Sequence, residues 1–372
     1  MKYNEIRRKT RQVRIGNRSI GGEAPIAIQA MTKTDPHDAA ATLAQVRSLE
    51  AAGCEIVRMT VPDLAAADTL WAVKNAGVSI PLVADIHFDY RIALRCAEVG
   101  VDKIRINPGN IGDAERVRQV ADACRRRGIP IRIGVNSGSV EKALLAKYGG
   151  PTAEALCESA LRHAALLEQC EFYDTVISVK ASDPVTMIEA NRLLAQRCDY
   201  PLHLGVTEAG SREAGLIKSA VGIGALLCQG IGDTIRVSLT DRPEEEIGAA
   251  RKILSAVGVE GQCGMRIVSC PTCGRTKIDL IDLAERFERA VDYEGLRDVP
   301  VKVALMGCAV NGPGEASEAD IGIAGGKGEA LLFAHGQALE KIPEDAIIPR
   351  LIAEIRAFAG KGEKCHRNQD PT

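Results

Sequence analysis

Residues 102–139 read DKIRINPGNIGDAERVRQVADACRRRGIPIRIGVNSGS and contain one complete copy of a repeating pattern. The first aliphatic run, DKIRINPG, predicts a strand. An amphipathic stretch rich in Ala, Val and Arg follows and closes at Gly128, a common helix stop. A second aliphatic run, PIRIGVNSG from Pro130, predicts another strand. The order strand, helix, strand is typical of a parallel β-α-β unit.

The same pattern recurs over the first 240 residues of the chain. The other strand-like runs are PIAIQAMT from Pro25, CEIVRMTV from Cys54, PLVADIH from Pro81, DTVISVKAS from Asp174, PLHLGVTEAG from Pro201 and DTIRVSLTD from Asp233. Eight strand-then-helix units predict a (β/α)8 barrel of the TIM type, which typically takes about 250 residues. A doubly wound open sheet is the alternative, but its dinucleotide fingerprint is missing. The one G-x-G candidate, at Gly222, follows helix-like sequence.

The repeat stops near residue 258, and we predict a barrel over 1–258 and a second, smaller α+β domain over 262–372. The second segment has its own strand-like runs and ends in an amphipathic helix. These elements are RIVS from Arg266, VKVALM from Val301, DIGIAG from Asp320, EALLF from Glu329 and the helix EDAIIPRLIAEIRAFAG from Glu344. The length of 372 residues fits two domains.

Composition excludes several classes of protein. Lys and Arg number 47 against 49 Asp and Glu, so no basic field favours nucleic acid or anionic membrane. Aromatic residues make up only 3%, too few for the stacking platforms that bind single strands. No apolar run approaches the roughly 18–20 residues of a membrane span. The twelve cysteines stand mostly alone in helix-like stretches, which indicates a reducing, cytoplasmic setting.

Polar and cationic residues occupy the strand positions that face the barrel axis. Alternate residues of a strand point to opposite faces, so the aliphatic residues of each run face the helices. The inward positions then hold the cations Arg58, Arg105, Arg132, Lys180 and Arg236. Asp85 is the one clear inward acid, and His87, Asn136, His203 and Ser238 are further inward polar residues. Barrel interiors are usually filled by Val, Ile and Leu, so this lining is unusual.

This surplus of inward cations predicts an anionic ligand. An unpaired buried charge costs several kcal/mol, and the guanidinium fork matches phosphate well. We therefore predict a ligand with two or more phosphate charges at the C-terminal mouth of the barrel. The alternative is that the cations pair with loop carboxylates such as Asp63, Glu208 and Asp241. The loops NPGNIGD and GVNSGSVE, placed just before helix starts, favour anion binding weakly.

Three cysteines and a carboxylate stand out in the second domain. SCPTCGR places Cys270 and Cys273 in a C-x-x-C turn, a pattern that zinc sites, redox pairs and iron–sulfur clusters share. Cys308 ends an apolar strand in MGCAVNGPGEA, and the turn that follows presents Glu315. No second C-x-x-C and no His at zinc-finger spacing follows. A cluster held by three thiolates, with one iron left for a weaker oxygen ligand, fits better than closed zinc or a dithiol.

The motifs of the whole chain resemble those of the bacterial 4-hydroxy-3-methylbut-2-enyl diphosphate synthases, iron–sulfur enzymes of the non-mevalonate isoprenoid pathway. The matching segments are IAIQAMTKTDPHD, VRMT, ADIHFDYR, IRINPGN, GVNSGS, SVKASD, GVTEAG, IRVSLT, SCPTCGR and MGCAVNGPGE. The last two are highly specific together. No extra domain interrupts the predicted barrel, so the chain is similar to the shorter, two-domain form of that family.

The resemblance implies a substrate and a cofactor. The substrate would be 2-C-methyl-D-erythritol 2,4-cyclodiphosphate, opened by two electrons with loss of water to the linear allylic diphosphate. A [4Fe–4S] cluster would lie on Cys270, Cys273 and Cys308, with Glu315 as exchangeable fourth ligand. Flavodoxin or ferredoxin would donate the electrons, and the chain would form a homodimer.

The resemblance also implies roles for the barrel residues. The five inward cations would bind the diphosphate. Polar contacts or proton donors near the carbon skeleton would come from Asp85, His87, Asn136, His203 and Glu208. Two other interpretations remain open at this point. One is a redox-independent barrel aldolase, epimerase or pterin-type synthase with a zinc-stabilised appendage, and the other is an iron-responsive nucleic-acid binder.

Overall fold

A computed structural model describes residues 3–259, 264–308 and 319–360 of the chain. The chain divides into two compact units, Met1–Val259 and Glu260–Thr372, and each is described by itself. Within the described ranges, no helix has the length and apolar character needed to cross a membrane.

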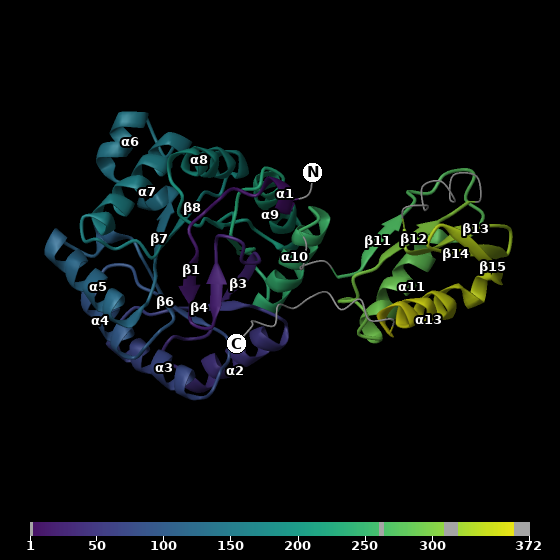
Figure 1. The fold of residues 1–372 in the computed structure, drawn as a ribbon, viewed down its shortest axis with the longest axis horizontal. Coiled ribbons are helices and arrows are strands. Elements are labelled where there is room, and N and C mark those ends of the chain that lie inside the picture. The colour runs from purple at the N-terminus through teal and green to yellow at the C-terminus, as the bar shows by residue number, and fades with distance from the viewer. Residues whose placement is uncertain (1–2, 260–263, 309–318, 361–372) are drawn as a thin grey trace. The chain divides into compact units, whose positions relative to one another are not determined.

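The first unit is built on eight parallel strands that form a barrel (Figure 1). The sheet order is β8-β7-β6-β5-β4-β3-β10-β9, and a parallel bridge between Ile177 and Leu202 brings the two edges together. The strands are β3 (Ala27–Met31), β4 (Ile56–Thr60), β5 (Leu82–Asp85), β6 (Lys103–Ile106), β7 (Ile131–Asn136), β8 (Thr175–Lys180), β9 (His203–Leu204) and β10 (Thr234–Ile235). The predicted (β/α)8 barrel is therefore confirmed.

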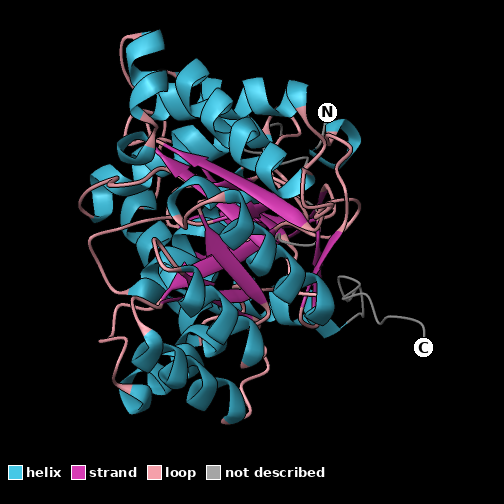
Figure 2. Cartoon of the chain, turned by 90° about the vertical axis from the view of Figure 1, so that its left-hand side faces the viewer, coloured by secondary structure: helices cyan, strands magenta, loops and turns pink. Residues whose placement is uncertain are grey.

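Helices follow the strands and wrap around the barrel, as Figure 2 shows for this unit. They are α2 (Ala39–Ala51), α3 (Leu64–Asn75), α4 (Tyr90–Glu98), α5 (Ala114–Arg127), α6 (Lys142–Tyr148), α7 (Ala153–Glu168), α8 (Pro184–Arg197), α9 (Arg212–Leu227) and α10 (Pro243–Ala256), with the short 3-10 turns η1 (Pro108–Asn110) and η2 (Ser137–Ser139). Five of these helices begin after an aspartate whose carboxylate accepts a hydrogen bond from a first-turn N–H. Such caps satisfy donors that a helix start leaves free.

The outward strand residues pack against the helices in one large aliphatic core. A separate small cluster closes the N-terminal end of the barrel. It joins the antiparallel hairpin of β1 (Val13–Ile15) and β2 (Arg18–Ile20) to the first inward residues of four strands. Its members are Val13, Ile15, Ile20, Ala27, Ile56, Val83 and Val176. The short helix α1 (Tyr3–Ile6) precedes this hairpin, and Tyr3 Oη donates to Gly232 O at 2.5 Å. The barrel therefore has an apolar floor.

The last two barrel strands are shorter than the sequence predicts. β10 ends at Ile235, before Arg236, although the predicted run continues to Asp241. The Arg236 N–H still donates to Leu204 O at 2.9 Å, so one ladder bond continues past the strand end. Val237 and Leu239 remain in the aliphatic core. The inward and outward alternation thus extends beyond the regular strand.

The second unit has a five-stranded sheet in the order β11-β12-β13-β14-β15. The first three strands are parallel and the last three antiparallel. Its elements are β11 (Arg266–Ser269), α11 (Leu280–Tyr293), β12 (Lys302–Met306), β13 (Ile321–Gly325), β14 (Glu329–Ala334), β15 (Gln337–Pro343), η3 (Glu344–Ala346) and α13 (Ile347–Gly360). Figure 1 shows α11 and α13 beside each other on this sheet, and both contribute to its main core.

Two elements of this unit were missing from the predicted set. β15 is an edge strand whose residues are almost all exposed, so it has no apolar alternation to reveal it. α11 supplies Leu283, Phe287 and Val291 to the core at helical spacing. That spacing is a signal the sequence does contain. The four predicted strands and the C-terminal helix are present.

Candidate active site

The lumen of the barrel is lined by buried charged and polar side chains. Arg58, Asp85, Arg105, Arg132 and Lys180 are all less than a tenth exposed. Each stands at an inward position of its strand, while its neighbours along the strand belong to the aliphatic core. Strand alternation thus brings together side chains from β4 to β8 as the sequence predicts.

Asp85 neutralises two of these cations. Its Oδ1 lies 3.0 Å from Arg105 Nη1, and its Oδ2 lies 3.5 Å from Arg58 Nε. Burial alone would raise the pKa of Asp85, but the charges of Arg58 and Arg105 outweigh burial and hold this pKa below its ordinary value. Burial also lowers the pKa of Arg58 to about 10 despite Asp85. Arg105 Nη2 donates further to Gly134 O at 3.1 Å. Asp85 thus sets the direction of two guanidiniums.

A second buried acid corrects the expectation that Asp85 is alone. Glu246, in the first turn of α10, is only 2% exposed. Its carboxylate lies 3.7 Å from Arg236 Nε and 3.1 Å from Lys33 Nζ. Glu246 belongs to a helix, so counting the inward residues of strands does not find it. Arg236 is therefore partly paired.

The predicted loop acids do not neutralise the lumen. Asp63 contacts His37, and Asp241 Oδ2 lies 3.9 Å from Arg212 Nε. Neither His37 nor Arg212 is one of the five predicted lumen cations. Both acids therefore contact exposed residues outside the lumen. Among the described segments, no carboxylate lies within ion-pair distance of Arg132 or Lys180. Of the five predicted cations, these two carry the unbalanced charge.

The unbalanced cations lower one another's pKa values. Burial, and then the charges of the other lumen cations, lower the pKa values of Arg132 and Lys180 well below their ordinary range. The Nε and Nη1 atoms of Arg132 have no hydrogen-bond partner among the described residues. Burial and the charges of Arg132 and Arg58 also lower the pKa of Lys103, which is 0% exposed. It is inward by the same alternation as Arg105, so the sequence contains a signal for it that our prediction did not use.

His87 and Glu208 lie at the mouth, after the strands end, and both side chains are exposed. His87 Nε2 lies 3.1 Å from Arg105 Nη1. A guanidinium can only donate, so Nε2 accepts and the ring proton of a neutral His87 stands on Nδ1. Glu208 has a φ of 51°, which is uncommon for a residue with a side chain. Such strain often accompanies functional positions.

The remaining predicted polar residues fall into two groups. Asn136 and Ser238 are partly buried beyond the strand core, near the mouth. The Asn136 N–H donates to Ser139 Oγ at 2.9 Å, which shapes the loop after β7. His203, by contrast, is 0% exposed and lies deep in the lumen, where Nδ1 is 2.7 Å from Thr234 Oγ1. Burial and the surrounding cations lower the pKa of His203 well below its ordinary range.

His163 was not among the predicted site residues, yet it contacts the loop after β6 and the loop after β7. It belongs to α7, is 2% exposed, and its Nδ1 accepts the Gly109 N–H at 3.0 Å. Its Nε2 lies 3.4 Å from Glu141 Oε1, just after the loop that follows β7. A Cβ on Gly109 would approach the imidazole to 2.3 Å, so only glycine fits this contact. A histidine within a helix pattern gives no sequence signal for such a role.

The three predicted thiol ligands stand at one end of the second sheet. Cys270 follows β11 directly, and its N–H donates to Leu305 O of β12 at 3.1 Å. Cys308 follows β12 and is buried, while Cys273 is exposed. The Cys273 N–H donates to Thr276 Oγ1 at 3.1 Å, and the Lys277 N–H donates to Gly307 O at 2.9 Å. The C-x-x-C turn is thereby tied to the residue before Cys308.

The thiols do not form a compact ligand set for a single ion. In the parts of the chain that the structure describes, no three Cys, His, Asp or Glu side chains gather closely enough to hold one metal ion. A cubane cluster is bound at its corners, so its ligands need not converge on one point. The donor set of three thiols suits such a cluster. A hydrogen bond from the Arg275 N–H lowers the pKa of Cys273, which favours its thiolate form. Glu315 lies outside the described residues, as do Cys263 and Cys365.

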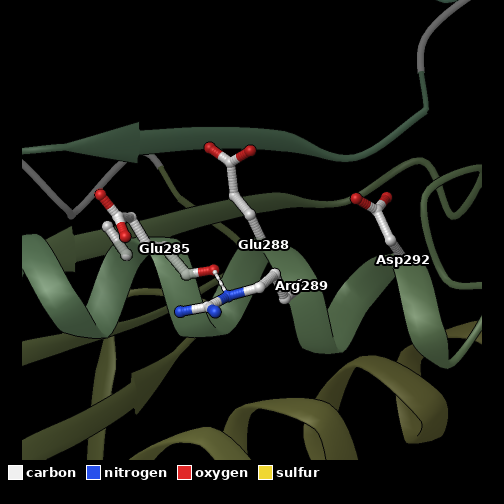
Figure 3. A pocket seen from close by; sticks show the side chains of 5 residues that line it. Glu285, Glu288, Arg289 and Asp292 are labelled. Atoms are coloured by element: carbon white, nitrogen blue, oxygen red, sulfur yellow. Dashed lines mark hydrogen bonds between the residues drawn. The ribbon is translucent and has the colours of Figure 1, made fainter.

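A shallow surface pocket on α11 offers no competing anion site. It is lined by Ala284, Glu285, Glu288, Arg289 and Asp292 (Figure 3). Arg289 Nε donates to Glu285 O at 3.3 Å, along the helix. Three carboxylates against one guanidinium would repel a diphosphate.

The fold and the site define the class of a TIM-type barrel protein with a buried cationic lumen. The family model described as "GcpE TIM-barrel domain" matches residues 10–251, and the one described as "GcpE protein C-terminal domain" matches residues 266–357. The chain belongs to the GcpE family.

Curated relatives match nearly the whole chain. One from Ruminiclostridium cellulolyticum is 55% identical over 349 residues, covering 94% of this chain and 98% of the relative. One from Geobacter sulfurreducens is 55% identical over 350 residues, with the same coverage of both chains. Both are named 4-hydroxy-3-methylbut-2-en-1-yl diphosphate synthase (flavodoxin). These names fit the resemblance of the sequence motifs.

Solved structures show the likeness of the barrel alone. A type I 3-dehydroquinate dehydratase from Clostridium difficile aligns with a TM-score of 0.50 at 14% identity, covering 67% of this chain and 98% of that one. At this identity the similarity concerns the fold only.

Proposed function

We propose that this chain catalyses the reductive opening of 2-C-methyl-D-erythritol 2,4-cyclodiphosphate, with loss of water, to 4-hydroxy-3-methylbut-2-enyl diphosphate. The family and the names of relatives at 55% identity support this reaction. The observation that carries it within the molecule is the pair of buried, unbalanced cations Arg132 and Lys180. A diphosphate supplies the negative charge that they lack.

The lumen residues have different roles in binding the diphosphate. Asp85 holds Arg58 and Arg105 in fixed directions, so both guanidiniums present their remaining donors without reorganising. Arg132 and Lys180 meet the diphosphate with donors that no carboxylate of the described residues occupies. Arg236, which forms an ion pair with Glu246, is the last of the predicted cations and lies near the mouth. Ser238 and Asn136 add polar contacts at the same end of the barrel.

Two residues are suited to handle protons at the mouth. His87 carries its proton on Nδ1 because Nε2 accepts from Arg105, so Nδ1 can donate to a substrate oxygen. Glu208 is held at φ 51° at the mouth of the barrel, which makes it the second candidate for this role. We assign the proton donor to one of these two residues.

We further propose that Cys270, Cys273 and Cys308 hold a [4Fe–4S] cluster, with Glu315 as an exchangeable fourth ligand. The donor set of three thiols at adjoining strand ends supports this assignment. When bound, such a cluster supplies electrons one at a time. Flavodoxin is the electron donor that the relatives' names carry, and we propose it as the donor here.

We also propose a homodimer and a cytoplasmic location. Exposed apolar side chains on the packed pair α8 and α9, namely Val185, Ile217 and Val221, are consistent with contact to a second copy. The ten cysteines among the described residues are free thiols, as a reducing compartment requires. Analytical ultracentrifugation of the native protein tests the dimer.

One experiment separates this function from the zinc-stabilised aldolase or epimerase. The protein is purified without oxygen, and its iron, zinc and acid-labile sulfide are measured. It is then assayed with the cyclodiphosphate and reduced flavodoxin. We expect about four irons and four sulfides per chain, as a [4Fe–4S] cluster holds, and formation of the linear diphosphate. A colourless protein with one zinc and no turnover would overturn the proposal.

A further inference from the structure

Lys103 lies below the cations that face the mouth of the barrel. It is the first residue of β6 and pairs with Val83, a member of the apolar floor. Arg105 stands two residues further along the same strand, a step of about 6–7 Å toward the mouth. The hairpin residues Val13 and Ile15 close the barrel beneath this level. Lys103 therefore projects into the closed end of the lumen.

The charged groups that act on Lys103 are cations. Its pKa is lowered by burial and then by Arg132 and Arg58, and no carboxylate raises it. Asp85, the inward acid of the strands, is already engaged by Arg58 and Arg105. A protonated amine in such a place costs several kcal/mol unless an opposite charge accompanies it. The base of the lumen is thus built for negative charge.

Several polar atoms at the base have no hydrogen-bond partner among the described residues. They are Lys103 Nζ, Arg132 Nε and Nη1, His203 Nε2, and both amide atoms of Gln29. All four residues are at most 1% exposed. His203 Nδ1 already bonds Thr234 Oγ1, and if it accepts that hydroxyl proton, Nε2 carries a hydrogen to donate. Buried donors are rarely left unused in native proteins.

The four residues also belong to one level of the barrel. His203 pairs with Thr234, which pairs with Ala27 of the floor. Gln29 pairs with Ile56 and Arg132 with Val176, and both partners are floor residues. The charges of Lys103 and Arg132 both lower the pKa of His203, as groups in close proximity do. These donors therefore follow the floor residues in register, as does Arg58, which pairs with Val83 and is held by Asp85.

We propose that Lys103, Arg132 and His203 bind one small inorganic monoanion, of the chloride class, beneath the substrate's diphosphate. Gln29 Nε2 adds a neutral donor to this base site. The anion keeps Lys103 charged and balances the lower cations before any substrate arrives. Lys180 and Arg236, which stand at and beyond the strand ends, bind the diphosphate above the anion, and Arg132 contacts both the anion and the diphosphate. The anion site rests on the lumen residues alone, and its place beneath the diphosphate rests on the function proposed above.

Bromide is the probe, because it replaces chloride and can be located by anomalous diffraction. Crystals of the full-length protein are grown in bromide, with and without the cyclodiphosphate. We expect one anomalous peak in contact with Lys103 Nζ and Arg132, retained at equal height when substrate is bound. A water in that place, a peak only beside Lys180, or loss of the peak on adding substrate would overturn the proposal. The wild-type crystals decide this without any variant.

Variants supply an independent measure in solution. Bromide in place of gluconate, at equal ionic strength, should raise the Tm of the wild-type protein along a saturating curve. Lys103→Met removes the charge at similar length and should abolish that rise. Lys142→Met, at an exposed position of α6, is the matched control and should keep it. An equal rise in all three proteins would mean that bromide acts on the surface, which contradicts a base site.

Discussion

The barrel lumen and the cysteine end of the second sheet differ in what holds their functional groups. In the lumen, Arg58, Asp85, Arg105 and Arg132 stand on neighbouring hydrogen-bonded strands, and all are buried. In the second unit, Cys308 is buried and Cys270 half-buried after two strands, and Cys273 is exposed in a turn. The sheet positions the buried charges of the first site, whereas the second site is a set of donors at strand ends.

This difference predicts which property each substitution will change, stability and binding in the lumen or cofactor content at the thiols. Charges forced together in a buried lumen are part of the fold's own energetics, so changing them alters stability as well as binding. The thiols lie at strand ends outside the buried clusters of the second unit, although Cys270 packs against them. Changing the thiols should remove the cofactor and leave the fold. The predictions below test that division, beginning with the largest effect.

Cys308→Ser should lose the cluster and reduce turnover to background, because a hydroxyl is a poor replacement for a thiolate ligand of iron. The barrel should unfold at the same temperature as in the wild-type protein. Iron and sulfide content, turnover and thermal denaturation measure these outcomes. Cys228→Ser, at an exposed position after α9, is the control and should change none of them. Normal turnover by Cys308→Ser would refute its assignment as a ligand.

Asp85→Asn should destabilise the barrel by about 3–5 kcal/mol, since it leaves Arg58 and Arg105 buried without their counter-charge. The pKa of Asp85 is depressed in the folded state, so its stabilisation is complete above about pH 4, the ordinary carboxyl range. That stabilisation is lost as the pH falls through the folded-state pKa. Urea unfolding of both proteins at several pH values should show the gap at pH 7 and its closure in acid.

Arg132→Ala should weaken substrate binding on the order of 100-fold, as expected when a buried charged contact is removed. The cluster spectrum should stay unchanged, and stability should hold or rise, because one unbalanced cation is gone. Arg127→Ala, exposed at the end of α5, is the matched control. If Arg132→Ala unfolds the protein while the control does not, Arg132 is a structural residue and the diphosphate assignment is wrong.

Glu315→Gln should retain much of the cluster and slow turnover several-fold, since the amide is a weaker exchangeable ligand than a carboxylate. Metal analysis and steady-state kinetics separate the two effects. Turnover equal to that of the wild-type enzyme would argue against a role for this carboxylate.

His163→Phe should raise KM with little change in kcat. The Gly109 N–H loses its acceptor, at a cost of about 1–3 kcal/mol, and the loop after β6 loses its support. His163→Gln offers an amide oxygen as acceptor and should restore much of the wild-type KM. Equal KM values in all three proteins would show that the loop does not need this contact.

The eight strands and their inward cations could be predicted because a strand repeats every two residues. Lys103 follows the same rule but stands at the strand start, which the prediction did not count. β15 could not be found because an exposed edge strand carries no apolar alternation. Glu246 and His163 lie on helices, where their neighbours in sequence say nothing about the strand or loop that they reach.

The amino-acid sequence by itself determined which residues face the barrel axis and which thiols are available, because backbone geometry alternates side chains without regard to distant parts. The tertiary structure decided which charged side chains form ion pairs with one another. Closing the barrel brought Asp85 between Arg58 and Arg105 and placed α10 so that Glu246 meets Arg236. Among the residues that the structure describes, it also left Arg132, Lys180 and Lys103 without a carboxylate partner. Which charges remain unbalanced depends on distances between residues far apart in the chain, and only the folded barrel sets those distances.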